Sequence, residues 1–240
     1  MVRIKSQFNN FCYWPSNPKK VIEFIGGSYL ATKPDLAYKR FIESLYKKNY
    51  AVHAYTYFPQ FDHHELSINA WKDFKKCRHI LSQRLGREIS SIRVGHSLGC
   101  KLHLISPDGG RNSEKFISIS FNNFGAERSI TLLKKISKKL DFKSEFSPSP
   151  SKTLDIIKSS YIQKNNLLIK FDSDKLDQTD YLLDYLRRRR EDNSQGILLK
   201  GTHTLIASAG LREDLLGKWA DDNLKRNTIK RICDLIDKSL

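Results

Sequence analysis

Short runs of apolar and β-branched residues alternate along this chain with segments whose apolar residues recur every three to four positions. The runs predict strands, and the longer segments predict amphipathic helices. The expected strands are 21–25, 50–58, 91–94, 115–121, 166–171 and 196–200. The expected helices are 34–46, 65–85, 98–105, 179–190 and 223–240. This alternation predicts a mostly parallel, doubly wound sheet with helices on both faces, in a single domain spanning 1–240.

The sequence Gly95-His96-Ser97-Leu98-Gly99 lies between a predicted strand and a predicted helix. It has the form G-x-S-x-G, the nucleophile elbow of α/β-hydrolases, in which a tight strand-to-helix turn exposes a serine hydroxyl above the sheet. The pattern is short, so its context decides its meaning. A side chain two residues before or after the serine would collide with the neighbouring strand or helix. The flanking elements therefore favour Ser97 as a nucleophile over a plain Gly/Ser turn, and predict an α/β-hydrolase fold.

A nucleophilic serine needs a base, and in this fold the base follows the serine and the acid along the chain, just past a strand. His203 follows the predicted strand 196–200 and is the only histidine after position 103. We therefore expect His203 to be the base.

The acid that orients the base is expected just past the predicted strand 166–171. Three carboxylates follow that strand, at Asp172, Asp174 and Asp177. An acid about three residues beyond the strand end favours Asp174. Asp172 lies close to the strand, and Asp177 is placed to begin or cap the next helix. The preference is for Asp174, and the other two stay open.

An oxyanion hole requires two backbone N–H groups directed at the developing negative charge. One is expected from Leu98, directly after the nucleophile. The other is expected from the loop that follows strand 21–25, where glycine lets the backbone approach a substrate closely. Gly27 is the first choice and Ser28 the second.

Ligand sites in parallel sheets lie at the carboxyl ends of the strands. Residues there that are candidates to line a pocket are Gly26, Ser28, His96, Asp62, His63, Asn122, Asn123 and Asp177. His63 is more readily interpreted as a surface residue at the entry to a helix. Cys100, just beyond the elbow, is expected to be packed rather than reactive.

The segment 124–161 interrupts the alternation of strands and helices. It is polar and rich in lysine, and it contains Ser147-Pro148-Ser149-Pro150-Ser151. α/β-Hydrolases insert a cap over the active site at this place. Two interpretations stand level: a lid that sets substrate access, or a surface loop with a short helix at 130–140.

The net charge of +16 raises the question of nucleic-acid binding. The charges are arranged otherwise, because most lysine pairs lie on predicted helices as solvated faces, and the cluster 187–190 ends a helix whose dipole it complements. No basic motif with interleaved aromatic residues is present, so no specific nucleic-acid binding is expected. A basic face could still make weak contact with an anionic membrane surface.

Cysteine spacing and hydropathy bear on compartment. The four cysteines lie apart, at Cys12, Cys77, Cys100 and Cys233, which argues against a zinc ribbon or a disulfide scaffold and suits a reducing cytosol. No run of eighteen apolar residues and no apolar segment near Met1 is found, so neither a transmembrane helix nor a signal peptide is expected. We expect a cytoplasmic protein without a metal or cofactor.

Several longer segments are distinctive together. They are Phe24-Ile25-Gly26-Gly27, Phe61-Asp62-His63, 95–103, 119–124, Glu145-Phe146-Ser147-Pro148-Ser149-Pro150, 167–171, Leu176-Asp177-Gln178 and Gly201-Thr202-His203. In these the chain resembles, from about Trp14 to Ala207, a family of α/β-hydrolase-like proteins of cyanobacteria and plastids catalogued as domain of unknown function 1350. The resemblance implies an α/β-hydrolase fold and a cytoplasmic or plastid setting, and it implies no substrate.

The leading hypothesis is a serine hydrolase of the esterase, thioesterase or lipase kind, acting on a small-molecule or lipid acyl substrate. One alternative is a non-catalytic binding or scaffold protein, favoured if His203 lies more than about 6 Å from Ser97. Another is acyl transfer to an acceptor other than water, through the same residues. The sequence does not define the acyl group or the oligomeric state.

Overall fold

The strands in the described part of the chain form one eight-stranded sheet. The computed structural model describes residues 4–127, 145–207 and 223–240, and in these the strand order is β1-β2-β4-β3-β5-β6-β7-β8. The strands are β1 (Ile4–Gln7), β2 (Asn10–Tyr13), β3 (Val21–Ile25), β4 (Ala51–Tyr55), β5 (Ser91–His96), β6 (Phe116–Ile119), β7 (Asn166–Phe171) and β8 (Gln195–Leu199). From β4 to β8 all neighbours are parallel, which confirms the predicted sheet type.

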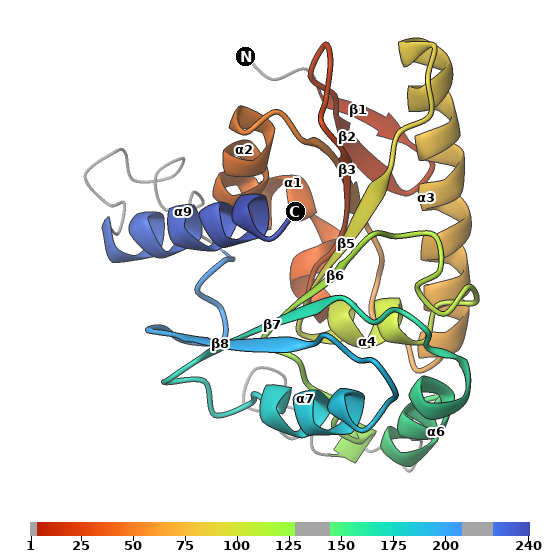
Figure 1. Ribbon diagram of the computed structural model, residues 1–240, viewed down its shortest axis with the longest axis vertical. Coiled ribbons are helices and arrows are strands. Elements are labelled where there is room, and N and C mark those ends of the chain that lie inside the picture. Colours follow the sequence, from red (N-terminus) through yellow and green to blue (C-terminus); the bar gives the residue numbers. More distant parts are fainter. Residues whose placement is uncertain (1–3, 128–144, 208–222) are drawn as a thin grey trace.

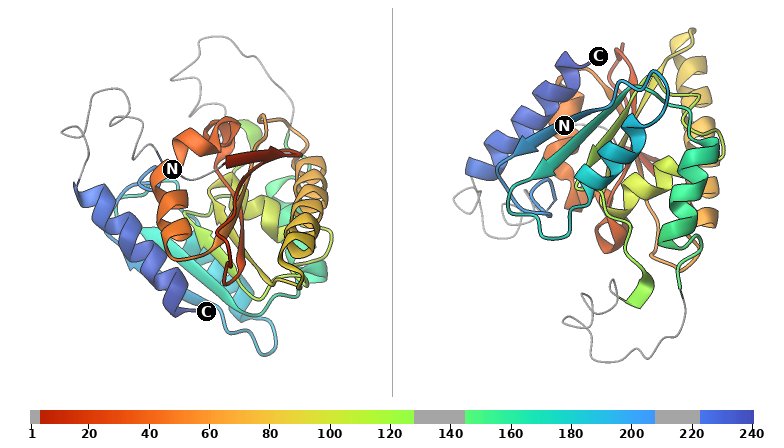
Figure 2. Two further views of the ribbon diagram at one scale, coloured as in Figure 1. Left: turned by 90° about the horizontal axis from the view of Figure 1, so that it is seen from above. Right: turned by 60° about the horizontal axis from the view of Figure 1, so that its bottom comes forward.

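Helices cover both faces of this sheet, as predicted (Figures 1 and 2). One face carries α1 (Pro34–Ala37), α2 (Lys39–Lys47) and α9 (Asn223–Lys238). The other carries α3 (His63–Leu85), α4 (Leu98–Leu104), α6 (Pro150–Ser160) and α7 (Thr179–Arg187). None of the described helices has the length and apolar character needed to cross a membrane.

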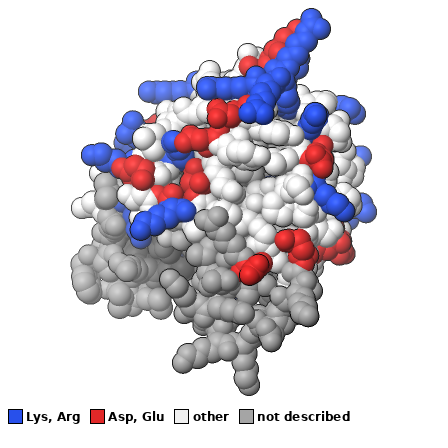
Figure 3. Space-filling model, turned by 90° about the horizontal axis from the view of Figure 1, so that it is seen from below, with Lys and Arg blue, Asp and Glu red and all other residues white. Residues whose placement is uncertain are grey.

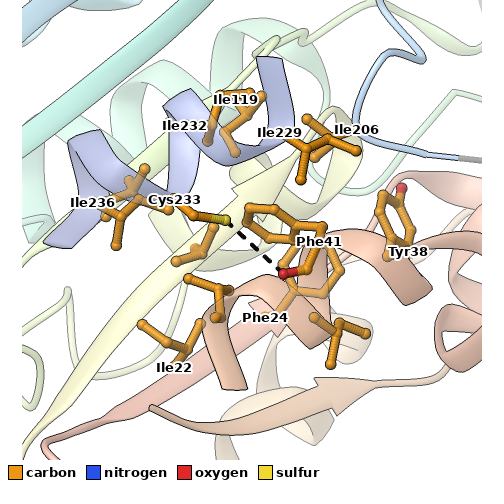
Figure 4. Packing of buried hydrophobic residues seen from close by; sticks show 14 of the residues in the cluster. Ile22, Phe24, Tyr38, Phe41, Ile119, Ile206, Ile229, Ile232, Cys233 and Ile236 are labelled. Carbon is orange, nitrogen blue, oxygen red and sulfur yellow. Dashed lines mark hydrogen bonds between the residues drawn. The ribbon is translucent and has the colours of Figure 1, made fainter. Parts of the chain in front are cut away.

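Helix α9 closes the core on its face of the sheet. Its isoleucines and Cys233 point toward α2 and the central strands, where they meet aromatic side chains such as Phe24 and Phe41 (Figure 4). Ile232 and Cys233 are fully buried. Burial of these side chains, at roughly 25 cal/mol for each Å² of apolar surface, holds the C-terminal helix on the sheet.

The structure differs from the predicted elements at both sides of the sheet. Strands β1 and β2 form an antiparallel hairpin that pairs with β4 and that the sequence pattern did not predict. Each strand has only four residues, which is too short for an alternating pattern to stand out. The predicted helix 34–46 is divided at Tyr38 into α1 and α2.

Helix α6 lies within segment 124–161 and was not among the helices that the sequence predicted. It joins β6 to β7 and buries Ile157 against Leu182 of α7, so it is the crossover helix of a parallel strand pair. Ser149 caps its first turn by accepting a hydrogen bond from the Lys152 N–H. The helix expected at 130–140 lies outside the described residues.

Candidate active site

Ser97 occupies a strained turn between β5 and α4. Its backbone angles are φ 55° and ψ −122°, a conformation that non-glycine residues rarely adopt and that is typical of a nucleophile elbow. The flanking glycines are required by contact. A Cβ on Gly95 would lie 2.6 Å from the backbone of Cys100, and one on Gly99 would overlap the carbonyl of Ile25.

The structure brings Ser97, His203 and Asp174 into one chain of hydrogen bonds. The Nε2 atom of His203 lies 2.9 Å from Ser97 Oγ, and its Nδ1 atom lies 2.7 Å from Asp174 Oδ2. An ionised carboxylate can only accept, so Nδ1–H donates to Asp174. Nε2 is then free to accept the Ser97 proton, which is the arrangement that a general base requires.

Asp174 is the carboxylate that the structure gives to His203. Burial by itself would raise the pKa of Asp174, but the hydrogen bond and charge of His203, with the N–H of Leu176, hold this pKa below its ordinary value. The side chain is inaccessible to solvent. Asp174 is therefore ionised at neutral pH and fixes the orientation of the imidazole.

The two alternative acids have other partners. Asp177 accepts hydrogen bonds from the N–H and the hydroxyl of Thr179 and so holds the start of α7, as its position predicted. Asp172 accepts from the N–H of Gly201 and the hydroxyl of Ser173. Asp172 thereby anchors the loop that carries His203 without contacting its ring.

Asn122, one of the candidate pocket residues, contacts the nucleophile directly. Its side-chain Nδ2 lies 2.9 Å from Ser97 Oγ. Ser97 Oγ thus accepts from Asn122 while it donates to His203. Asn123 points elsewhere, with its amide donating to the carbonyl of Pro150.

In the loop after β3, the N–H of Gly27 was expected to be free to bind an oxyanion, but it has a partner. The Gly27 N–H donates to the hydroxyl of Tyr38 at 2.8 Å, so this group is already engaged and is not free for an oxyanion. Gly27 itself lies against the nucleophile, since a Cβ added there would come within 3.1 Å of Ser97 Cβ. Ser28 follows as the first residue of the short helix η1 (Ser28–Thr32). First-turn N–H groups have no acceptor within their helix, and this applies to the Ser28 N–H.

Leu98 is the first residue of α4, and its N–H likewise has no acceptor within that helix. Gly26, the remaining candidate in the β3 loop, accepts a hydrogen bond at its carbonyl from the Tyr57 hydroxyl. His96 lies directly before Ser97, is buried, and contacts both Tyr38 and the backbone of His203.

Asp62 and His63 contact Phe146 and Ser147 rather than the nucleophile. Asp62 caps α3 through the Glu65 N–H, and pairs in a β-bridge with Ser147. His63 is only 3% exposed, which contradicts its interpretation as a surface residue. The cause is the ring of Phe146, which stacks on it with centroids 4.3 Å apart.

Lys101, which was not among the predicted site residues, is buried beside residues 146–148. It lies on α4 one turn beyond the nucleophile, and its Nζ donates to the carbonyl of Pro148 at 2.8 Å. Burial lowers the pKa of Lys101 to about 8, although the negative charge of Glu145 opposes the shift. Cys100, by contrast, is packed as predicted, and burial raises the pKa of its thiol to about 12.

A mostly parallel sheet with helices on both faces and a strained strand-to-helix turn after β5 defines an α/β-hydrolase fold. Solved structures agree. The protein is similar to carboxyl esterase 2 of the fungus Tuber melanosporum, with a TM-score of 0.63 and 15% identity over 100% of this chain and 87% of that one. It is also similar to a monoacylglycerol lipase of Paleococcus ferrophilus, with a TM-score of 0.59 and 12% identity over 99% and 100% of the two chains.

A third similar structure is the fluorophosphonate-binding serine hydrolase F of Staphylococcus aureus, with a TM-score of 0.57 and 15% identity over 97% of each chain. Residues 5–231 match the family model described as "Protein of unknown function (DUF1350)". The chain belongs to this family, as its motifs predicted. No curated protein shows significant sequence similarity to it.

Proposed function

We propose that this protein is a serine hydrolase that cleaves an ester or thioester bond of an acyl substrate. The observation that carries the proposal is the hydrogen-bonded chain from Ser97 through His203 to Asp174. The strained φ of Ser97 supports it, because proteins retain such a conformation where function requires it. The esterase, lipase and serine hydrolase with the same fold support the reaction class.

In acylation, Ser97 Oγ attacks the acyl carbon while His203 Nε2 takes the hydroxyl proton. The tetrahedral intermediate collapses when His203 returns that proton to the departing alcohol or thiol, and the acyl group remains on Ser97. Water then attacks the same carbon while His203 Nε2 takes a proton from the water. The carbon–Oγ bond breaks as His203 returns that proton to Ser97 Oγ. The products are a carboxylic acid and regenerated enzyme. Asp174 orients His203 and stabilises its charged form throughout.

Two N–H groups are proposed to stabilise the oxyanion, those of Leu98 and Ser28. Each lies in the first turn of a helix that begins beside the nucleophile. The choice of Ser28 over Gly27 follows from the hydrogen bond that Gly27 makes to Tyr38. A single oxyanion donor contributes about 10²- to 10³-fold to turnover.

A non-catalytic scaffold would have no need of a base beside the serine. The His203–Ser97 separation of 2.9 Å is well below the 6 Å that would favour a scaffold, so the geometry supports catalysis. The proposal is tested with p-nitrophenyl esters and acyl thioesters of increasing chain length, with wild-type protein and Ser97→Ala. Turnover by the wild type alone supports it, and folded wild-type protein that is inert on the whole series counts against it. Formation of a new ester when an alcohol is added would instead indicate acyl transfer.

Weak contact with an anionic membrane is a separate proposal that rests on charge. On the face shown in Figure 3, Lys and Arg side chains lie among Asp and Glu. The net charge of +16 still favours anionic surfaces over neutral ones. Binding to liposomes that contain phosphatidylserine, lost as salt is raised, would support this contact, and equal binding to neutral liposomes would contradict it.

A further inference from the structure

Tyr38 and His96 form a buried, hydrogen-bonded link beneath the candidate active site. The Tyr38 hydroxyl lies 2.8 Å from the Gly27 nitrogen and 2.8 Å from His96 Nδ1. At the far side of the same imidazole, His96 Nε2 lies 2.8 Å from the carbonyl oxygen of His203. Tyr38 and His96 are each 1% exposed, so water does not compete for these bonds.

The direction of every proton in this link follows from its two ends. The Gly27 N–H can only donate, so the Tyr38 oxygen accepts from it. In a neutral His96 ring whose proton is on Nε2, Nδ1 is an acceptor, so the Tyr38 hydroxyl donates its own proton to it. The carbonyl of His203 can only accept, so His96 Nε2 carries the proton. His96 is therefore the neutral Nε2–H tautomer. Burial acts in the same direction, since it lowers the pKa of His96 to about 3.

The link joins the two loops that must be held relative to Ser97. One end fixes the peptide of Gly27, directly before the Ser28 N–H proposed for the oxyanion. The other end fixes the backbone of His203, whose ring contacts the nucleophile. His96 lies between them, on the last position of β5, and is covalently joined to Ser97.

Packing leaves the link little freedom to move. The Tyr38 ring meets Phe24 edge to face at a centroid distance of 4.8 Å and meets His96 at 5.6 Å. Gly26 passes so close that an added Cβ would lie 2.5 Å from the Tyr38 ring. Tyr38 and His96 are therefore held in fixed positions by the packing around them.

We propose that Tyr38 and His96 are positioning residues, which together set the distance between the oxyanion loop and the base loop. This inference rests on the proposed hydrolase function. Neither side chain contacts the reacting atoms in the proposed steps. Their effect is on the placement of Ser28 and His203, so their loss lowers turnover more than substrate binding. Misplacement of reacting groups by about 1 Å can lower the rate by about 100-fold.

The kinetic test compares Tyr38→Phe with Tyr57→Phe. Tyr57 is a matched control, because its buried hydroxyl also bonds the same loop, at the Gly26 carbonyl, but does not reach His96. With p-nitrophenyl acetate we expect Tyr38→Phe to lower kcat about 10- to 100-fold, with KM within twofold of wild type. Tyr57→Phe is expected to change kcat less than twofold. Equal losses in both variants, or a change in KM alone, would overturn the positioning role.

His96 variants test the second half of the link. His96→Gln retains a donor that can reach the His203 carbonyl, whereas His96→Ala retains none. We expect His96→Gln to recover part of the kcat that His96→Ala loses, with both proteins equally folded by circular dichroism. Equal kcat in the two variants would contradict a role for the bond to His203.

A spectroscopic arm separates failure of this inference from failure of the proposed function. In protein labelled with ¹⁵N-histidine, the His96 resonances, assigned by their loss in His96→Gln, should show the Nε2–H tautomer from pH 8 to pH 5. Tyr38→Phe should shift the Nδ1 resonance, because that atom loses its donor. If no ester is hydrolysed by wild-type protein, the hydrolase proposal fails, while this measurement still decides the link. An Nδ1–H tautomer, or protonation near pH 6.5, would overturn it.

Discussion

The side-chain amide of Asn122 lies 2.9 Å from the hydroxyl oxygen of Ser97. This amide nitrogen can only donate, so it directs the Ser97 proton toward His203. A free hydroxyl oxygen accepts hydrogen bonds well, whereas the oxygen of an acylated serine is an ester oxygen and accepts poorly. The Asn122 contact therefore stabilises the free enzyme more than the acyl-enzyme.

We predict that Asn122→Leu slows deacylation more than acylation. Without the donor, the bond between the acyl carbon and Ser97 Oγ breaks less readily, while attack by Ser97 is unchanged or faster. Loss of one hydrogen bond of about 1 kcal/mol corresponds to roughly fivefold in rate. Intact-mass measurements during p-nitrophenyl ester turnover should show acyl-enzyme accumulating in the variant. Slower acylation without accumulation would contradict this assignment.

The choice among three neighbouring aspartates can be tested in one series. Asp174→Asn should lower kcat by about 10³- to 10⁴-fold, because the amide no longer fixes the His203 tautomer. Asp172→Asn and Asp177→Asn should lower it less than tenfold, since these carboxylates bond Gly201 and Thr179. A larger loss in Asp177→Asn than in Asp174→Asn would assign the acid differently.

Asp174 should also affect how the free energy of unfolding depends on pH. Because its pKa in the folded protein is held below its ordinary value, its ionised form stabilises the fold above about pH 4, and this contribution is lost as pH falls through the folded-state pKa. The difference in unfolding free energy between wild type and Asp174→Asn should therefore shrink as pH is lowered below about 4.

Lys101 predicts a stability that rises with pH. Its pKa is lowered to about 8 in the folded protein, against about 10.4 in an unfolded chain. Between these values the unfolded state binds more protons, so stability increases with pH, by up to about 3 kcal/mol. Urea unfolding from pH 7.5 to 9.5 should show a steeper rise for wild type than for Lys101→Met. Other titratable groups are common to both proteins, so parallel curves would show that the pKa of Lys101 is not lowered in the folded protein.

The elbow itself is testable through its glycines. Gly99→Ala should destabilise the protein by about 3 kcal/mol or more, because the new Cβ overlaps the carbonyl of Ile25. Gly86→Ala is the control without overlap: Gly86 has a positive φ, +66°, but nothing lies within 4 Å of an added Cβ. Its cost should be limited to backbone strain of about 1 kcal/mol. Similar melting temperatures for the two variants would contradict the packing described for the elbow.

Much of the candidate site could be predicted because its signals are local. The G-x-S-x-G pattern places Ser97 on a turn that only a few residue types allow. A histidine without competitors and an aspartate just past a strand completed the set. The six main strands and their mostly parallel arrangement followed from the same alternation of apolar runs and amphipathic segments.

What the sequence did not predict depends on contacts between distant segments. The sequence pattern indicates only that Tyr38 is an apolar residue of a helix. The fold brings its hydroxyl to Gly27 and His96. His63 lies in a polar stretch, yet Phe146 covers it from a segment more than eighty residues away along the chain. Helix α6 has few apolar positions, so its periodicity is weak although Ile157 is fully buried.

The most direct test of the account is labelling by a fluorophosphonate, which forms a covalent bond only with an activated serine. Peptide mass spectrometry should locate one adduct per chain on Ser97 in the wild type. Labelling should be absent in Ser97→Ala and at least about 100-fold slower in His203→Ala, which lacks the base. A folded wild-type protein that remains unmodified, or that is labelled equally fast without His203, would contradict the claim that Ser97 is an activated nucleophile.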